Sequence, residues 1–126
     1  MKNTFSDALI NNAGTRLDGD QLVLDVRLPW YRSMPLSVVE FAELTLDGQA
    51  VPLDAAELEL NGQRWPLQAL AGLTGESWFV LDSALLHVPL PARPKQAVQA
   101  SLLFKLYPPY IPMLTWVTRG QALLAA

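Results

Sequence analysis

The side chains that could perform acid–base, nucleophilic or metal chemistry are few in this sequence. There is one histidine, His87, and no cysteine, so the chain cannot supply a zinc site rich in His or Cys ligands. We interpret His87 as a structural residue at a strand edge. Glu57 and Glu59 alternate with leucines, which places both carboxylates on one strand face, about 6–7 Å apart. Glycosidases use paired carboxylates at a comparable separation. However, we interpret these two glutamates as part of the solvated face of an amphipathic strand.

Other kinds of site are not indicated either. The seven glycines occur singly, so there is no glycine-rich phosphate loop. The net charge is −3, and the basic residues do not form the stripe that nucleic-acid binding requires. We therefore expect no cofactor or metal in this chain and no nucleic-acid partner. The first residues lack an apolar signal segment and no stretch is long enough to span a bilayer, so the expected location is the cytoplasm.

One segment rich in aromatic residues stands out at residues 28–40. Prolines flank its aromatic residues and restrict the backbone, which favours a stiff loop. Trp, Tyr, Arg and Met are enriched at protein interfaces, and aromatic rings can also stack on a sugar or an aromatic ligand. The residues expected to contact a partner or a substrate here are Trp30, Tyr31, Arg32, Met34 and Pro35. The alternative is that Trp30 and Tyr31 cap the core of the domain.

A second aromatic segment follows at residues 106–116. It holds three prolines within five residues, and proline has no amide hydrogen to donate, so the segment cannot continue a central strand. We expect it to loop, bulge or run along an edge while exposing Tyr107, Tyr110 and Ile111. Tyr107 and Tyr110 therefore join the predicted contact residues. A corner packed onto its own domain is the alternative.

Strands are predicted to position these segments. Ten prolines are spread along the chain and leave little room for long helices. Residues 21–28 and 98–106 alternate apolar and polar side chains with a period of two, as half-buried strands do. Further strand candidates are residues 41–46, 49–53, 57–60, 63–67, 78–81, 85–90 and 116–124. Residues 67–73 could form a helical turn.

The turn signals complete the prediction of the fold. Asp47-Gly48 and Asn61-Gly62 suit tight hairpin turns, in which both central residues need a positive φ. Strands that recur about every ten residues predict a single all-β domain over residues 1–126, an antiparallel β-sandwich of jelly-roll or immunoglobulin-like type. Charged residues are only 17% of the chain, which suggests that a partner covers part of the surface. A compact domain with an apolar tail is the alternative.

Several motifs follow one another along these segments. The first is Tyr-Arg-Ser-Met-Pro-Leu-Ser-Val-Val-Glu at residues 31–40, and the next are Leu-Asp-Gly at 46–48 with Val-Pro at 51–52, and Leu-Asn-Gly at 60–62. Trp78 and the segment Leu-Tyr-Pro-Pro-Tyr-Ile-Pro at 106–112 come after them. In these motifs and their order the sequence resembles the small β subunit of bacterial C-glycoside deglycosidases. The first motif departs from the family at Ser33, where the family has glycine, which puts a positive φ at that position in doubt.

The resemblance implies a β-sandwich subunit joined to a larger α subunit in a hetero-oligomer. That α subunit would be a TIM barrel related to sugar-phosphate isomerases, with a divalent metal, and would carry the chemistry. The implied reaction cleaves the C–C bond between a 3-oxo-sugar and an aromatic aglycone such as a flavonoid, after a separate oxidoreductase has made the ketone. Our own hypothesis for Arg32 is an ion pair with a carboxylate of the partner, or internally with Glu40.

Three functions stay open at this point. The first is a partner-dependent subunit of a carbon–carbon lyase complex, without catalysis of its own. The second is a free-standing module that binds a carbohydrate or an aglycone. Its stacking platform would be Trp30, Tyr31, Tyr107, Tyr110 and Trp116. The third is an independent hydrolase that uses Glu57 and Glu59.

Overall fold

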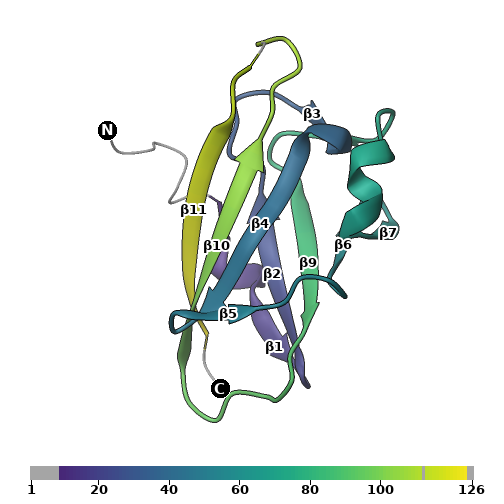
Figure 1. The fold of residues 1–126 in the computed structure, drawn as a ribbon. Helices are drawn as coiled ribbons and strands as arrows, with labels where there is room; N and C mark the ends of the chain where they lie inside the picture. The colour runs from purple at the N-terminus through teal and green to yellow at the C-terminus, as the bar shows by residue number, and fades with distance from the viewer. Residues whose placement is uncertain (1–8, 112, 125–126) are drawn as a thin grey trace.

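The computed structural model describes residues 9–111 and 113–124. Within these residues the chain is built almost entirely from strands (Figure 1). The strands are β1 (Arg16–Asp18), β2 (Gln21–Arg27), β3 (Met34–Pro35), β4 (Val39–Leu46), β5 (Gln49–Val51), β6 (Glu57–Leu60), β7 (Gln63–Pro66), β8 (Ser77–Trp78), β9 (Ser83–Pro89), β10 (Val98–Leu106) and β11 (Trp116–Leu124). The helical elements are the short 3₁₀ turns η2 (Asn12–Gly14), η3 (Leu36–Val38) and η4 (Leu67–Gly72). No helix in this part of the chain has the length and apolarity to cross a membrane.

Two antiparallel sheets face each other and enclose the core (Figure 1). One has the strand order β1-β2-β9-β6-β7 and the other has the order β11-β10-β4-β5. A two-stranded pair, β3 with β8, lies at one end and aligns Met34 with Trp78. The predicted antiparallel β-sandwich is thus confirmed.

The core is formed by the inward side chains of both sheets. The alternation expected for β10 holds, since Leu102, Phe104 and Leu106 are buried between outward residues. Trp78 is the largest fully buried side chain. Its ring lies edge-on to Phe104, with 6.0 Å between the ring centroids, and stacked on Phe41, with 6.5 Å between them. Such aromatic pairs each add about 0.5–1.5 kcal/mol beyond the burial of their area.

Both predicted hairpin turns form as expected. Asp47 and Gly48 connect β4 to β5 with φ of 49° and 83°, and Asn61 and Gly62 connect β6 to β7 with φ of 55° and 73°. These positive values are the ones that a type I′ turn requires at its two central positions. The helical turn expected at residues 67–73 is also present, as the 3₁₀ turn η4 (Leu67–Gly72).

Three local predictions were wrong. The strand at residues 21–28 is not half-buried, because Val23 and Asp25 on its second face are buried as well. Residues 78–81 do not form a strand, because only Ser77 and Trp78 pair with β3 and the chain then turns, with the amide of Asp82 donating to the carbonyl of Phe79. His87 does not lie at a strand edge, because β9 is placed between β2 and β6. The sequence pattern of one strand contains no information about which other strands flank it.

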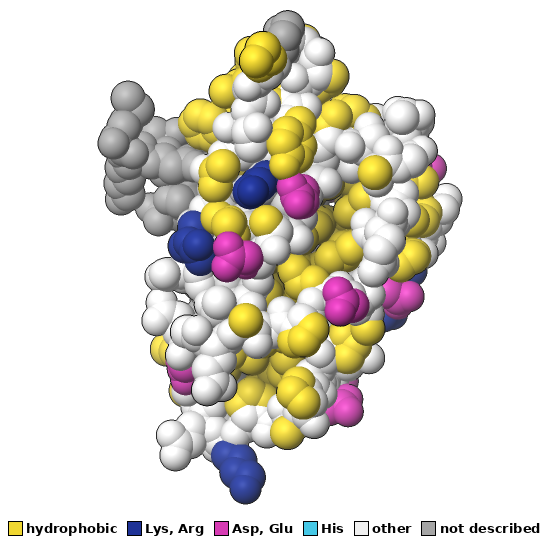
Figure 2. Space-filling model, in the orientation of Figure 1, with side chains coloured by type: hydrophobic (Ala, Val, Ile, Leu, Met, Phe, Trp, Pro, Cys, Tyr) yellow, Lys and Arg dark blue, Asp and Glu magenta, His cyan; other side chains and the backbone are white. Residues whose placement is uncertain are grey.

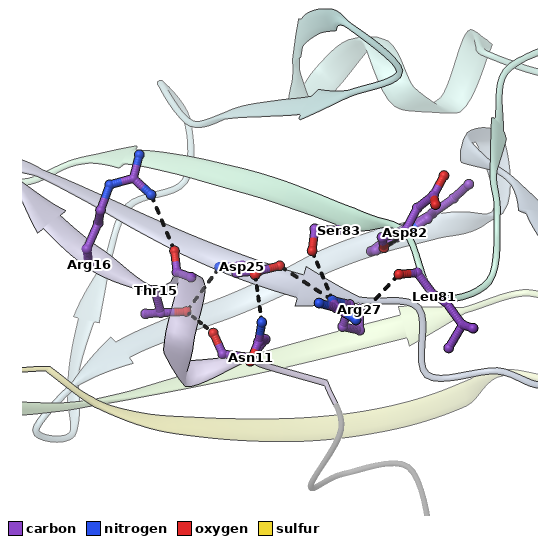
Figure 3. Close-up of polar contacts among 10 residues, drawn as sticks. Asn11, Thr15, Arg16, Asp25, Arg27, Leu81, Asp82 and Ser83 are labelled. Carbon is purple, nitrogen blue, oxygen red and sulfur yellow. Dashed lines mark hydrogen bonds and ion pairs between the residues drawn. The ribbon is translucent and has the colours of Figure 1, made fainter.

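The chain before β2 closes one edge of the sandwich. No pattern in the sequence had indicated a structural role for this segment. Ile10 forms a bridge with Val26, and the η2 turn then folds over the outer face of β2 (Figure 3). The carboxylate of Asp25 is buried beneath that turn and accepts a hydrogen bond from Asn11 Nδ2 at 3.0 Å. Gly14 packs directly on it, since a Cβ at this position would lie 2.1 Å from Asp25 Oδ2.

We predict that Gly14→Ala destabilises the protein by about 1–3 kcal/mol, because the added methyl group must displace a buried carboxylate from its partners. The free energy of unfolding in urea measures this effect. Gly72→Ala is the matched control, because a Cβ at Gly72 meets no atom within 4 Å. Equal stability of the two variants would contradict the close packing of Gly14 on Asp25.

Candidate interaction surface

Three loops meet at one end of the sandwich, at the top of Figure 1. They are residues 28–33 after β2, residues 79–82 between β8 and β9, and residues 107–115 between β10 and β11. We call them the first, second and third loop. Figure 2 shows hydrophobic side chains gathered at the same upper end, around the third loop. This end therefore brings together both aromatic segments that the sequence singled out.

Most of the large exposed hydrophobic side chains of the described residues belong to these three loops. The members of this end surface are Tyr31, Phe79, Val80, Leu81, Tyr107, Tyr110, Ile111 and Met113. Two more exposed hydrophobic residues, Val117 and Leu123, lie on β11. Large contiguous apolar areas on a soluble protein mark sites of interaction, so this end of the sandwich is the candidate interaction surface.

The predicted contact residues of the first loop divide into two groups. Tyr31 is 63% exposed and Arg32 is also exposed, so both are available for contact. Met34 is only 2% exposed and Trp30 only 7%, and both belong to the core cluster. Pro35 is half-buried at the end of β3. Trp30 and Met34 therefore support the loop from beneath.

A chain of hydrogen bonds links the first loop to the third. Trp30 Nε1 donates to Tyr110 Oη at 2.6 Å, and the Tyr110 hydroxyl donates to Tyr31 Oη at 3.0 Å. The guanidinium of Arg32 lies over the Tyr110 ring, 4.8 Å from its centroid, in cation–π geometry. The neighbouring Tyr110 is the largest cause that raises the pKa of Tyr31 above its usual value, against a smaller opposing effect of Arg32. Tyr31 therefore stays protonated at neutral pH.

Tyr107 is tied to β4 at the base of the third loop. Its hydroxyl donates to Glu40 Oε1 at 2.5 Å, and its backbone amide donates to the carbonyl of Val38 at 2.9 Å. The hydrogen bond to the Glu40 carboxylate raises the pKa of Tyr107, because ionisation would place two negative charges together. Arg32 and Glu40, for which an internal ion pair was considered, form none, since Glu40 faces Tyr107 and Arg32 faces Tyr110.

The second loop was not among the predicted contact residues, although it exposes three consecutive hydrophobic side chains. Several hydrogen bonds fix its backbone. Arg27 Nη1 donates to the carbonyl of Leu81 at 3.4 Å, as Figure 3 shows, and Trp78 Nε1 donates to the carbonyl of Asp82 at 3.0 Å. The amide of Val80 donates to Ser33 Oγ at 3.0 Å. Ser33 does not have a positive φ, and its hydroxyl instead connects the first loop to the second.

Two of the exposed hydrophobic residues also have an unusual backbone. The described non-glycine residues with positive φ are Asp47 and Asn61, both in hairpin turns, and Leu81 and Met113, with φ of 76° and 64°. Asp and Asn tolerate this conformation, but for Leu and Met it costs roughly 1–2 kcal/mol. Strained residues of this kind concentrate at functional sites. Their position at the end surface supports its assignment as the functional region.

The carboxylates considered for catalysis have other partners. Glu59 Oε1 lies 2.7 Å from His87 Nε2, and Glu57 Oε1 accepts a hydrogen bond from Arg64 Nε at 3.0 Å. Both glutamates lie on the outer face of β6 and belong to none of the three loops. The residues that the structure describes contain no group of three or more His, Cys, Asp or Glu side chains able to hold a metal ion.

One hollow of the described surface, of about 300 Å³, does not resemble an active site. It lies at the opposite end of the sandwich, between the β4–β5 turn and the loop that precedes β10. Asp47 is the single titratable side chain in its lining, and its Oδ1 accepts a hydrogen bond from the amide of Gln99. A lone carboxylate with a structural partner cannot provide the paired acid and base of a hydrolase.

The described residues form a β-sandwich whose end surface exposes aromatic and aliphatic side chains on loops that are bonded to one another. The sequence places the protein in a particular family of such domains, because residues 4–95 match the family described as C-glycoside deglycosidase beta subunit. The chain belongs to that family, which confirms the resemblance found in its motifs. The first and second loops lie within the matched residues, and the third loop lies beyond them.

Individual relatives agree with this assignment. The chain is 39% identical to a "C-glycoside deglycosidase beta subunit" of Arthrobacter globiformis, over 85% of this chain and 82% of the relative. It is 36% identical to a protein of the same description from Microbacterium trichothecenolyticum, over 83% of this chain and 80% of the relative. It is also 36% identical, over 75% of this chain and 76% of the relative, to a "3'-dehydrocarminate deglycosidase beta subunit" of Microbacterium sp.

We predict that Glu40→Gln lowers the pKa of Tyr107, because the neutral amide removes the charge that opposes ionisation. In the wild type the folded pKa exceeds the unfolded value of about 10. The contribution of Tyr107 to the stability of the folded protein is therefore complete below pH about 10, and it is lost as the pH rises through the folded pKa. Titration of phenolate absorbance should show one of the three tyrosines ionising at lower pH in Glu40→Gln. Glu43→Gln, on the same strand, should leave the titration unchanged.

Proposed function

We propose that the protein is the accessory β subunit of a complex that cleaves the C–C bond of 3-oxo-C-glycosides. The observation that carries the proposal is the end surface, on which fixed loops expose apolar side chains in a chain that belongs to a β-subunit family. The names of the relatives describe subunits, so the proposal includes a larger partner that covers this surface.

In this proposal the larger α subunit carries the chemistry. The resemblance supports a TIM barrel with a divalent metal ion as that partner. The 3-oxo group of the sugar acidifies the proton at C2, and a base of the α subunit removes it. The electron pair forms a C1–C2 double bond while the bond from C1 to the aglycone breaks, and the aglycone carbon takes a proton. The distribution of titratable groups described above gives the β subunit no evident part in these steps, so its role is binding.

The alternative of a free-standing carbohydrate- or aglycone-binding module has less support. Its best argument is Tyr31, whose ring is largely exposed. However, Trp30 is buried, Trp116 is half-buried with its ring edge-on to Trp30, and Arg32 lies over the ring of Tyr110. A sugar-stacking platform needs open ring faces, and this arrangement leaves few of them.

We predict that a tagged form of the protein recovers a stoichiometric TIM-barrel partner from its native host, identified by mass spectrometry. Leu81→Asn should reduce the recovery at least tenfold, because it removes an exposed anchor of the end surface. Asn tolerates the positive φ of Leu81, so this variant should fold normally. Leu123→Asn is the matched control, because Leu123 is 73% exposed, against 78% for Leu81, and lies far along β11.

Two results would contradict the proposal. If the wild-type protein is recovered alone and monomeric, the accessory-subunit function fails, and sugars and flavonoids should be screened for direct binding. If Leu123→Asn weakens the complex and Leu81→Asn does not, the partner covers the sheet face and the end surface is wrongly assigned.

We predict that Glu57→Gln and Glu59→Gln leave the lyase activity of the complex within about twofold of the wild type, since both carboxylates have structural partners on the outer face of β6. The deglycosylation rate of the reconstituted complex measures this. A loss of rate in either variant with normal thermal stability would instead favour a catalytic role for these glutamates.

A further inference from the structure

We propose that the Tyr31 hydroxyl and the Arg32 guanidinium form a binding site for one carboxylate side chain of the partner subunit. The inference rests on the proposed function and deepens it, because it names the chemical group that the partner must place at the first loop.

The direction of the hydrogen bonds determines what Tyr31 can offer. The indole nitrogen of Trp30 can only donate, so the Tyr110 oxygen accepts, and the Tyr110 proton is directed to the oxygen of Tyr31. The Tyr31 oxygen is thereby used as an acceptor. No hydrogen bond donated by the Tyr31 hydroxyl is found among the described residues, and Tyr31 is exposed, so this hydroxyl can donate to a partner. The first loop therefore presents Tyr31 as a donor.

Arg32 adds a second donor group next to the first. The guanidinium lies over the ring of Tyr110, 4.8 Å from its centroid, and Arg32 forms no ion pair among the described residues, so its N–H groups can bind an acceptor from a partner. Arg32 lies over the ring of Tyr110 and Tyr31 bonds to the hydroxyl of the same Tyr110, so one residue holds both groups at the first loop. Two adjacent donors with one positive charge match the two oxygens of a carboxylate.

When a partner covers the end surface, Arg32 needs an anion beside it. A partner that buries the neighbouring apolar side chains also removes water from Arg32, and a desolvated guanidinium without a counter-charge is strongly unfavourable. No carboxylate of the described chain pairs with Arg32, because the nearest candidate in the motif, Glu40, is bonded to Tyr107. The partner must therefore supply the negative charge.

The test measures the affinity of the partner, purified from the native host, for variants of this chain. Tyr31→Phe should weaken binding about tenfold, because it removes one hydrogen bond to a charged group. Arg32→Gln should weaken it at least thirtyfold and reduce its dependence on salt, because the partner's carboxylate is left buried and unpaired. Arg32→Lys keeps the charge but not the planar fork, so its affinity should lie between that of Arg32→Gln and that of the wild type. Arg119→Gln is the control, because it removes an exposed arginine outside the end surface and should bind like the wild type.

The outcomes separate this inference from the proposed function. If Tyr31→Phe and Arg32→Gln bind within twofold of the wild type while Leu81→Asn binds weakly, the carboxylate site is overturned and the docking surface stands. If they keep full affinity but raise the KM for the glycoside, the acceptor belongs to the substrate, and the inference of a partner carboxylate is also overturned. If the partner binds none of the proteins, including the wild type, the proposed function itself fails.

Discussion

Between the two sheets, directly beneath the exposed loops, the indole ring of Trp78 packs on Phe41 and Phe104 while its nitrogen donates to the carbonyl of Asp82. One side chain thus belongs to the core and also closes the second loop. The pairing of Trp78 with Met34 in the β3–β8 ladder ties the first loop to the same point. The geometry of the functional end therefore depends on how this tryptophan is packed.

The end surface is rigid because its three loops are bonded to one another. Ser33 joins the first loop to the second, and Tyr110 joins the third loop to the first through Trp30 and Tyr31. A surface that is ordered before binding loses little conformational entropy when a partner covers it. The cost of this order is visible in the strained backbone of Leu81 and Met113. Under the proposed function that cost is offset, because the surface is already ordered when the partner binds.

Much of the fold could be predicted from the sequence, because period-two patterns and turns such as Asp47-Gly48 are local signals. The strand order could not, since the position of β9 between β2 and β6 depends on contacts distant in sequence. At the candidate site, the composition of the sequence was enough to find the aromatic segments. It could not predict that Trp30 is buried and its neighbour Tyr31 exposed, because burial depends on how the strands and loops pack together. The second loop was missed because Phe79, Val80 and Leu81 resemble a buried strand until their flanking residues are placed.

The position of β9 also affects how the chain folds. Arg27 at the end of β2 bonds to Ser83 at the start of β9, 56 residues later, so the larger sheet cannot be completed until most of the chain has been synthesised. Pairing over such distances makes folding slow, on the order of milliseconds to seconds. In that interval the apolar end has neither its final geometry nor its partner, so newly made chains are prone to self-association. Synthesis of both subunits at the same time and place would shorten this exposure.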